Sequence, residues 1–301
     1  MMITRIRFLI IFLLMLNGAT IAQTQWEWVA PYPPRLPQTF STTVIGPKAY
    51  FWCDGNNVFS TPDTGRTFIA YPHYGPMNNV ANGVYPMQGI AFADSLIGYI
   101  VDLAHGEFRT TDGGWTWTQK GQEGSNTVLV AFGSSTIGWK LGVAGFYRTT
   151  DAGSTWSFIS TPLLDWNNFD GAFSKICAFD ANNLWVLKTN QLQASQPGPL
   201  WHSTNSRSSW TNISVGLSSD SMNQITYEDL VMRPSGYGCI TGTIYTPTAS
   251  YDSTRAVILT TSDFGATWAH KEFSHENYGD IITVSDSIWV LLGNAKPNCS
   301  V

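Results

Sequence analysis

The 301-residue chain has a formal net charge of −5, from 16 basic and 21 acidic residues, and only 12 % of its residues are charged. A soluble chain usually has about a quarter charged residues, which cover the outer faces of its helices, so this composition argues against a helical protein. The aromatic content of 14 % is too high for a disordered chain, and the acidic balance disfavours nucleic-acid binding. We therefore expect an all-β protein with a large core and no nucleic-acid partner.

Residues 1–22 have the pattern of a secretory signal peptide. Arg5 and Arg7 precede the apolar run Phe8–Leu16, and small and polar residues follow as far as Ala22. This run is too short to span a bilayer, for which about 20 residues are needed. No cysteine lies near the cleavage point predicted after Ala22, so a lipoprotein anchor is not expected. The pattern predicts a secreted, periplasmic or cell-surface protein formed by residues 23–301, without membrane insertion.

An eight-residue motif of the form Thr-x-Asp-x-Gly-x-Thr-aromatic recurs along residues 23–301. Four intact copies have as their marked positions Asp63, Gly65, Thr67 and Phe68; Asp112, Gly114, Thr116 and Trp117; Asp151, Gly153, Thr155 and Trp156; and Asp263, Gly265, Thr267 and Trp268. The fourth copy in chain order is degenerate, with Asn205 in place of the Asp and Trp210 at its end. An Asp carboxylate accepts backbone N–H bonds in a tight turn, and Gly takes a positive φ without a Cβ penalty. The motif therefore predicts a hairpin turn held by its Asp, and a looser turn in the degenerate copy.

A second periodic signal is an aromatic residue at the start of a short apolar strand. It occurs at Tyr50, Tyr99, Trp139, Trp185, Tyr237 and Trp289. The spacing of 40 to 52 residues is typical of four-stranded propeller blades. The repeat units cover roughly 38–70, 87–120, 127–160, 173–213, 225–271 and, in part, 278–301, and the polar stretches Gln191–Pro199 and Thr243–Arg255 predict longer hairpin loops. We expect a β-propeller of four-stranded antiparallel blades, with five full blades and a partial sixth, each packed against its neighbours.

The sixth unit stops before its motif. In the first three units the motif Asp follows the aromatic residue by 12 or 13 residues, which would place the next Asp at about residue 301 or 302. We therefore expect the chain to be the front part of a longer, C-terminally truncated protein with at least six blades. We also expect Trp26–Val29 to supply a strand to the final sheet.

The motif resembles the Asp-box, or BNR repeat, of sialidase-like propellers, in which it forms the hairpin between the third and fourth strands of a blade. The opening segment Gln25–Pro33 and the run Arg109-Thr-Thr-Asp-Gly-Gly resemble exported bacterial BNR propellers related to the photosystem II stability and assembly factor. This resemblance implies a non-catalytic propeller used for protein binding or assembly.

The sialidase-like resemblance also raises the question of glycoside hydrolysis. Such sialidases use an arginine triad, a Tyr nucleophile with a Glu partner, and an Asp acid/base. Arg35, in Pro34-Arg-Leu-Pro37, loosely echoes the family's Arg-Ile-Pro motif, and only Arg233 and Arg255 remain outside the Asp-box regions to complete a triad. The cluster Tyr227-Glu-Asp229 contains the right residue types, but adjacent residues on a strand point to opposite faces.

Two further alternatives rest on residues outside the motif. Hydrolysis by a pair of carboxylates stays open because four acidic residues lie there, namely Asp165, Asp170, Glu228 and Asp229. Carbohydrate binding on exposed aromatic side chains stays open because three tryptophans have no assigned place in the repeat, namely Trp52, Trp115 and Trp166. Trp166 is the strongest of these, since it lies in an inter-strand loop.

Neither the four cysteines nor the five histidines cluster at the spacing of a metal site. Three of the cysteines, Cys53, Cys177 and Cys239, lie in apolar strand patterns and are expected to be buried, unpaired thiols. We therefore expect no metal and no cofactor. The sequence favours an exported, non-enzymatic propeller scaffold for a protein or glycan partner, with Arg35, Trp166 and Arg233 as candidate ligand contacts. The alternatives are a sialidase-like hydrolase and a carbohydrate-binding module.

Overall fold

The computed structural model describes residues 39–45, 48–53, 57–62, 67, 69–71, 89–102, 106–121, 127–142, 145–159, 173–191, 198–205, 209–217, 224–246, 254–274, 276–285 and 288–295. All regular elements in these ranges are β-strands, and none of the described residues forms a membrane-spanning helix. The predicted signal peptide, Trp26–Val29 and residues 296–301 lie outside the described residues.

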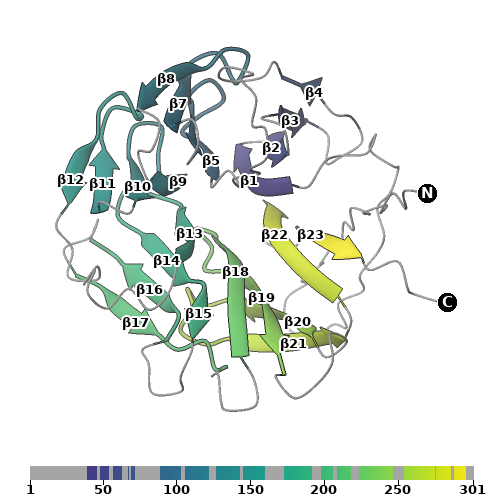
Figure 1. The fold of residues 1–301 in the computed structure, drawn as a ribbon. Coiled ribbons are helices and arrows are strands. Elements are labelled where there is room, and N and C mark those ends of the chain that lie inside the picture. The colour runs from purple at the N-terminus through teal and green to yellow at the C-terminus, as the bar shows by residue number, and fades with distance from the viewer. Residues whose placement is uncertain are drawn as a thin grey trace, which may run out of the picture.

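The strands form six antiparallel sheets (Figure 1). The first sheet contains β1 (Thr39–Ile45), β2 (Lys48–Cys53), β3 (Asn57–Thr61) and β4 (Ile69–Ala70). The second contains β5 (Gly89–Phe92), β6 (Gly98–Asp102), β7 (Gly106–Thr110) and β8 (Thr118–Gly121). The third contains β9 (Thr127–Phe132), β10 (Gly138–Gly142), β11 (Gly145–Thr149) and β12 (Ser157–Ile159).

The fourth sheet contains β13 (Phe173–Ala178), β14 (Leu184–Lys188), β16 (Leu200–Ser203) and β17 (Thr211–Ile213). The fifth contains β15 (Asn190–Gln191), β18 (Gln224–Met232), β19 (Gly238–Tyr245), β20 (Arg255–Thr261) and β21 (Ala269–Ser274). The sixth contains β22 (Glu276–Ser285) and β23 (Ile288–Ala295). The predicted all-β architecture, with five complete blades and a partial sixth, is confirmed.

The first strand of each sheet lies next to the first strand of the following sheet. β1 contacts β5, β5 contacts β9, β9 contacts β13, β13 contacts β18, and β18 contacts β22. β22 in turn contacts β1 (Figure 1). The six sheets are therefore arranged around a common axis, with their first strands innermost.

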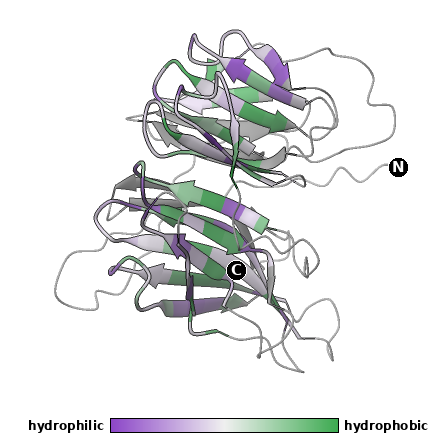
Figure 2. Ribbon diagram, turned by 90° about the vertical axis from the view of Figure 1, so that its left-hand side faces the viewer, coloured by the Kyte–Doolittle hydropathy of each residue, from purple (hydrophilic) through white to green (hydrophobic). Residues whose placement is uncertain are grey.

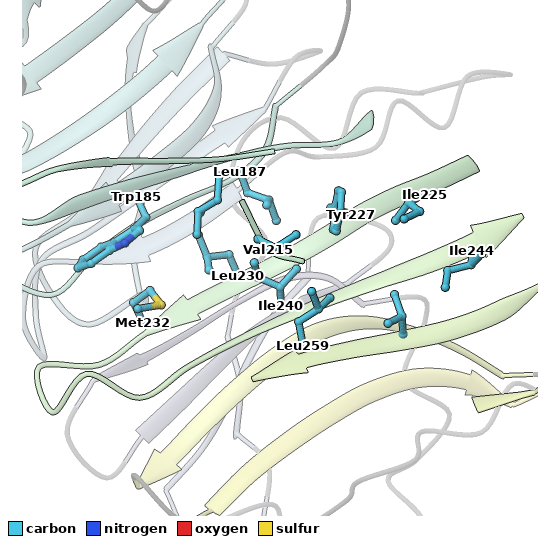
Figure 3. Close-up of a cluster of buried hydrophobic side chains, with 12 residues drawn as sticks. Trp185, Leu187, Val215, Ile225, Tyr227, Leu230, Met232, Ile240, Ile244 and Leu259 are labelled. Carbon is cyan, nitrogen blue, oxygen red and sulfur yellow. The ribbon is translucent and has the colours of Figure 1, made fainter. Parts of the chain in front are cut away.

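The hydrophobic core is divided into clusters between consecutive sheets. The cluster between the fourth and fifth sheets packs Trp185 and Leu187 against Tyr227, Leu230 and Ile240 (Figure 3). Equivalent clusters join the first sheet to the second, the second to the third and the third to the fourth. Because the third sheet is covered by neighbouring sheets on both faces, its second strand, β10, is buried along its whole length. Figure 2 shows green, hydrophobic bands on the strands of several sheets.

A short strand lies at the start of the connection between β14 and β16, for which the sequence predicts a longer hairpin loop over Gln191–Pro199. Asn190 and Gln191 form β15, which pairs with Thr226 and Ile225 of β18 in the next sheet. The Tyr227 N–H also donates a hydrogen bond to the Thr189 carbonyl, at 2.6 Å. Backbone hydrogen bonds from the start of this connection therefore link the fourth sheet to the fifth.

Candidate functional site

The recurring motif forms the turn between the third and fourth strands of a sheet. In the second sheet the Thr116 N–H and the Thr110 hydroxyl both donate to Asp112 Oδ1 at 2.8 Å, and the Thr116 hydroxyl donates to Oδ2 at 2.6 Å. The Thr110 hydroxyl in turn accepts the Gly114 N–H at 3.0 Å. One carboxylate thus joins both ends of the turn.

The same network recurs in the third and fifth sheets around Asp151 and Asp263. The opening threonines, Thr110, Thr149 and Thr261, are absent from the predicted set of turn residues, although each of them bonds both to the Asp and to the Gly N–H. Their recurrence at the first motif position is the signal that identifies them.

Two consecutive residues after the Asp have a positive φ, whereas the sequence pattern predicts this only for the Gly. The φ values are 75° and 100° for Gly113 and Gly114, and 56° and 77° for Ala152 and Gly153. In the fifth sheet Phe264 takes the first of these positions, with a φ of 59°. A bulky residue rarely adopts this conformation, so the turn holds Phe264 in a strained backbone geometry.

The first positive-φ residue ties its turn to the turn between the first and second strands of the same sheet. The N–H groups of Gly113, Ala152 and Phe264 donate to the carbonyls of Leu96, Thr136 and Gly236, at 2.8 to 2.9 Å. Both turns therefore lie at the same end of the second, third and fifth sheets. We call this end of the propeller, formed in the described part by residues 93–97, 111–117, 133–137, 150–156, 233–237 and 262–268, the motif face.

The motif turns also hold adjacent sheets together. Arg109 Nε of β7 donates to the Ala152 carbonyl in the third sheet, at 2.8 Å. The closing Trp156 packs edge-on against Tyr99 of the second sheet, with ring centroids 5.3 Å apart. Trp210 packs in the same way against Phe146 of the third sheet, at 6.2 Å. The motif thus stabilises the joints between blades as well as its own turn.

The degenerate fourth copy keeps most of the network. Asn205 Oδ1 accepts the Ser209 N–H at 2.9 Å and the Ser203 hydroxyl at 3.1 Å. Its Nδ2 donates to the Ser209 hydroxyl at 2.8 Å, so the direction of this last bond is reversed relative to the Asp copies. Residues 206–208 of this turn lie outside the described residues, as do Asp63, Gly65 and Phe68 of the first copy, whose Thr67 is exposed.

Hydrogen bonding lowers the pKa of the motif carboxylates. Donation by the Thr155 and Thr267 hydroxyls is the largest cause, and it places the pKa of Asp151 and of Asp263 at about 2. Burial opposes the shift at Asp112, but the bonds from Thr116 and Thr110 outweigh it and hold that pKa below its usual range.

We expect Asp112→Ala to lower the free energy of unfolding by about 1–2 kcal/mol. The substitution removes the acceptor for the Thr116 N–H and for two hydroxyls, and partial exposure limits the loss because water can replace some bonds. Urea denaturation of the purified protein measures the change. An unchanged stability combined with a lost binding activity would instead make Asp112 a ligand contact.

Acid should weaken the turn in the third sheet. A depressed carboxyl pKa contributes stability that is fully present above the unfolded value of about 3.9 and disappears as the pH falls through the folded value. For Asp151 this window runs from about pH 4 down to the folded pKa of about 2. The stability difference between the native protein and Asp151→Asn should therefore shrink between pH 5 and pH 2 in denaturation curves, and a constant difference would contradict the assignment.

Outside the motif, a buried ion pair joins the second and third sheets. Lys140 Nζ lies 2.7 Å from both carboxylate oxygens of Glu107, and the Tyr99 hydroxyl also donates to this carboxylate. The ammonium group lies over the rings of Tyr147 and Trp156, at 5.3 and 5.1 Å from their centroids. Burial, followed by the nearby Glu107 charge, raises the pKa of Tyr99. These polar groups provide hydrogen-bond partners and counter-charges for one another in the buried interface between the two sheets.

The acidic cluster on β18 is incorporated into the fifth sheet. Tyr227 is fully buried in the core, where burial raises its pKa, and its hydroxyl faces the Leu217 carbonyl at 3.5 Å. A register shift between Tyr227 and Asp229 leaves Glu228 without a partner in the β18–β19 register. Asp229 pairs with Lys175 of the fourth sheet at 2.7 Å, and Glu228 accepts the Thr243 hydroxyl at 2.7 Å. Burial raises the pKa of Glu228.

The other carboxylates whose side chains the structure describes also have structural partners. Asp94 and Asp180 accept backbone N–H groups in the turns between first and second strands, at 2.7 to 2.8 Å. Glu272 pairs with Arg255 at 2.9 Å across two outer strands. Every carboxylate whose side chain the structure describes therefore has a structural partner. The described residues contain no group of three potential metal ligands.

Two of the three arginines considered for a sialidase-like triad, Arg233 and Arg255, lie far apart in the fifth sheet. Arg233 follows Met232, which pairs with Gly238, whereas Arg255 pairs with Ile244 near the other end of β19. Since a strand rises about 3.3 Å per residue, the two arginines lie about 20 Å apart along the sheet. Arg35, Trp166, Asp165 and Asp170 lie outside the described residues.

Large apolar side chains are exposed on the motif face. Trp115 is 53 % exposed and touches Tyr71 edge-on at 5.1 Å, and Leu96 and Phe264 are also exposed. Of the three tryptophans suggested for glycan binding, Trp115 is the one whose side chain the structure describes; Trp52 lies in β2, and Trp166 lies outside the described residues.

Two cysteine thiols are described, and neither is a candidate for reactivity. Burial raises the pKa of Cys177 to about 11 and also raises the pKa of Cys239.

No family model and no curated protein sequence matches the chain. Among solved structures it is similar to YCF48 from Cyanidioschyzon merolae, with a TM-score of 0.53 and 13 % identity over 88 % of this chain and 97 % of that one. YCF48 bound to a D1 peptide matches with a TM-score of 0.36 and 16 % identity over 70 % and 93 % of the two chains. The GH74 enzyme of Niastella koreensis matches with a TM-score of 0.49 and 18 % identity over 78 % of this chain but only 38 % of the enzyme. The predicted resemblance to propellers of the YCF48 type is confirmed at the level of the fold.

Proposed function

We propose that this chain is an exported, non-catalytic propeller scaffold that binds another protein. The observation that carries the proposal is the structural use of every carboxylate whose side chain the structure describes, in motif turns, strand-to-strand turns and ion pairs. Hydrolysis by two carboxylates needs one group free to reach the substrate or a water molecule. The similarity in fold to YCF48 supports a scaffold further.

Glycoside hydrolysis is the second candidate, and one observation favours it. Burial raises the pKa of Glu228, and a raised carboxyl pKa is the property that a general acid requires. The Thr243 hydroxyl already occupies one carboxylate oxygen of Glu228, and the neighbouring Asp229 is paired with Lys175. These contacts favour a structural role for both residues.

An activity assay separates the two candidates. The purified chain is incubated with a fluorogenic sialoside and with xyloglucan, alongside Glu228→Gln, which keeps an acceptor for Thr243. We expect no turnover by either protein. Turnover by the native chain that Glu228→Gln abolishes would overturn the scaffold proposal in favour of hydrolysis.

Binding of the chain to another protein is tested by a separate experiment. Chemical cross-linking of the chain in the exported fraction of its own cells should join it to a discrete protein, which is then purified and titrated against the chain. Saturable binding supports the scaffold. Binding to a glycan array that disappears in Trp115→Ala would replace the protein partner with a carbohydrate.

Export is tested by sequencing the N-terminus of the exported protein. Cleavage of the predicted signal peptide after Ala22 would give a mature chain that starts at Gln23. An exported protein that still starts at Met1 would contradict this part of the proposal.

A further inference from the structure

The third strands of the second, third and fourth sheets carry a basic side chain at the same place in the repeat. It stands three residues before the motif Asp or Asn and lies opposite an aromatic residue of the second strand. The three pairs are Arg109 with Tyr99, Arg148 with Trp139, and His202 with Trp185. Arginine stays protonated in proteins, whereas histidine changes its charge near neutral pH. The fourth sheet therefore has a titratable group where the second and third sheets have a permanent positive charge.

The His202 ring packs on the hydrophobic core between the fourth and fifth sheets. Its centroid lies 4.0 Å from that of the Trp185 ring, with an angle of 7° between the two planes. Trp185 is fully buried in this core, and His202 is partly buried (Figure 3). A change in the charge of His202 therefore acts directly on this interface.

The hydrogen bonds around His202 identify the nitrogen that carries the proton in the neutral ring. The Asn183 side-chain N–H donates to Asp180 Oδ2 at 2.8 Å, and Asn183 Oδ1 lies 3.2 Å from His202 Nε2. Because an amide oxygen is an acceptor, Nε2 carries the proton and Nδ1 has none. Among the described residues, none forms a hydrogen bond with Nδ1. A second proton would therefore place a charged N–H on Nδ1 without a described acceptor.

The groups around the ring compensate a positive charge only in part. Thr211, opposite His202 on β17, is uncharged, and so are Met232 and Trp268, which the fifth sheet contributes to the adjoining core. Among the described residues, Asp180 is the charged group that acts on the ring. Burial lowers the pKa of His202, and the attraction of Asp180 opposes this shift without cancelling it.

We propose that His202 is an acid-sensitive element of the propeller: a proton on its ring weakens the packing of β16 on Trp185 and opens the outer half of the fourth sheet, β16 and β17. The ordinary pKa of histidine is about 6.5, and the folded chain binds the proton less tightly than the unfolded chain does. The stabilisation is therefore fully present above about pH 6.5 and is lost as the pH falls from there through the folded-state pKa. This device belongs to the fold and does not depend on the proposed binding function.

Hydrogen exchange of the native chain at about pH 7.5 and about pH 5.5 tests the proposal, after correction for the intrinsic pH dependence of amide exchange. We expect the amides of β16 and β17 to lose protection at the lower pH relative to those of β7 and β11, which carry Arg109 and Arg148. Exchange of the histidine ring C–H, followed by mass spectrometry, gives the pKa of His202 in the same protein. The fold-change in amide exchange should not exceed the ratio of the acid dissociation constants of His202 in its folded and opened states.

Two substitutions at His202 remove the change in charge. His202→Gln keeps an N–H donor for Asn183 and stays neutral, and His202→Arg introduces the residue of the second and third sheets, which stays charged. Both variants should lose the extra exchange of β16 and β17 in acid. The matched control is His270→Gln, which replaces an exposed histidine on β21 and should keep this extra exchange.

Three results would overturn the proposal. One is a pKa of His202 above the ordinary value, which would show that the Trp185 ring and Asp180 hold the charged imidazole and that acid strengthens the interface. Another is a loss of protection in β16 no larger than that in β7 and β11. The last is acid-dependent exchange of β16 that persists in both His202 variants. The first two results come from the native chain, so they decide the question even where a variant fails to fold.

Discussion

Replacement of Lys140 by Met is expected to lower the free energy of unfolding by about 3–5 kcal/mol. The ammonium group neutralises Glu107, which is 3 % exposed and belongs to the neighbouring sheet. Removing one partner of a buried ion pair leaves the other charge desolvated and uncompensated. The loss should appear as a lower urea midpoint with an unchanged slope.

A double variant and a surface pair provide the controls. Glu107→Gln combined with Lys140→Met removes both charges, so it should recover much of the stability that Lys140→Met loses. Glu272→Gln breaks the Arg255–Glu272 pair, which is largely solvent-accessible, and should cost less than about 1 kcal/mol. A loss of similar size for Lys140→Met would show that Glu107 finds another partner.

Trp185→Ala is expected to lower the free energy of unfolding by about 3–5 kcal/mol as well, through loss of buried contacts. The indole is fully buried between the fourth and fifth sheets (Figure 3). It stacks on the His202 ring, and its centroid lies 5.1 Å from that of the Phe179 ring. Thermal and urea denaturation should both report the change.

Trp115→Ala is the matched control for this experiment. It removes the same side chain from a position that is 53 % exposed, so its effect should stay below about 1 kcal/mol. Comparable losses for the two variants would mean that the joint between the fourth and fifth sheets contributes little to stability.

The repeat explains why the fold could be predicted from the sequence. Each motif copy contains the residues that make its own turn, and the aromatic register adds the strand before it, so both signals are local. Asp112 and Gly114 show this, since their bonding partners lie within four residues. The spacing of the copies then determines the number of blades.

Contacts between blades could not be predicted in this way. Lys140, between Trp139 and Leu141, has the pattern of a strand residue facing solvent, yet it is buried because its counter-charge comes from another sheet. The bond from Arg109 to the Ala152 carbonyl and the pairing of β15 with β18 likewise join residues of different repeats. The separation of Arg233 from Arg255 depends on strand direction, which residue types do not report.

The contacts between consecutive first strands, and from β22 back to β1, have a consequence for folding. Apart from β15, the strands of each sheet follow one another in sequence, so every blade can form from a short stretch of chain. The contact between β1 and β22 instead brings the two ends of the described chain together, and closing so long a loop costs more conformational entropy than any step within a blade. Closure should therefore come late in folding, because non-local contacts form slowly. The interface between the first and sixth sheets should also unfold before the interfaces between sheets that are consecutive in sequence.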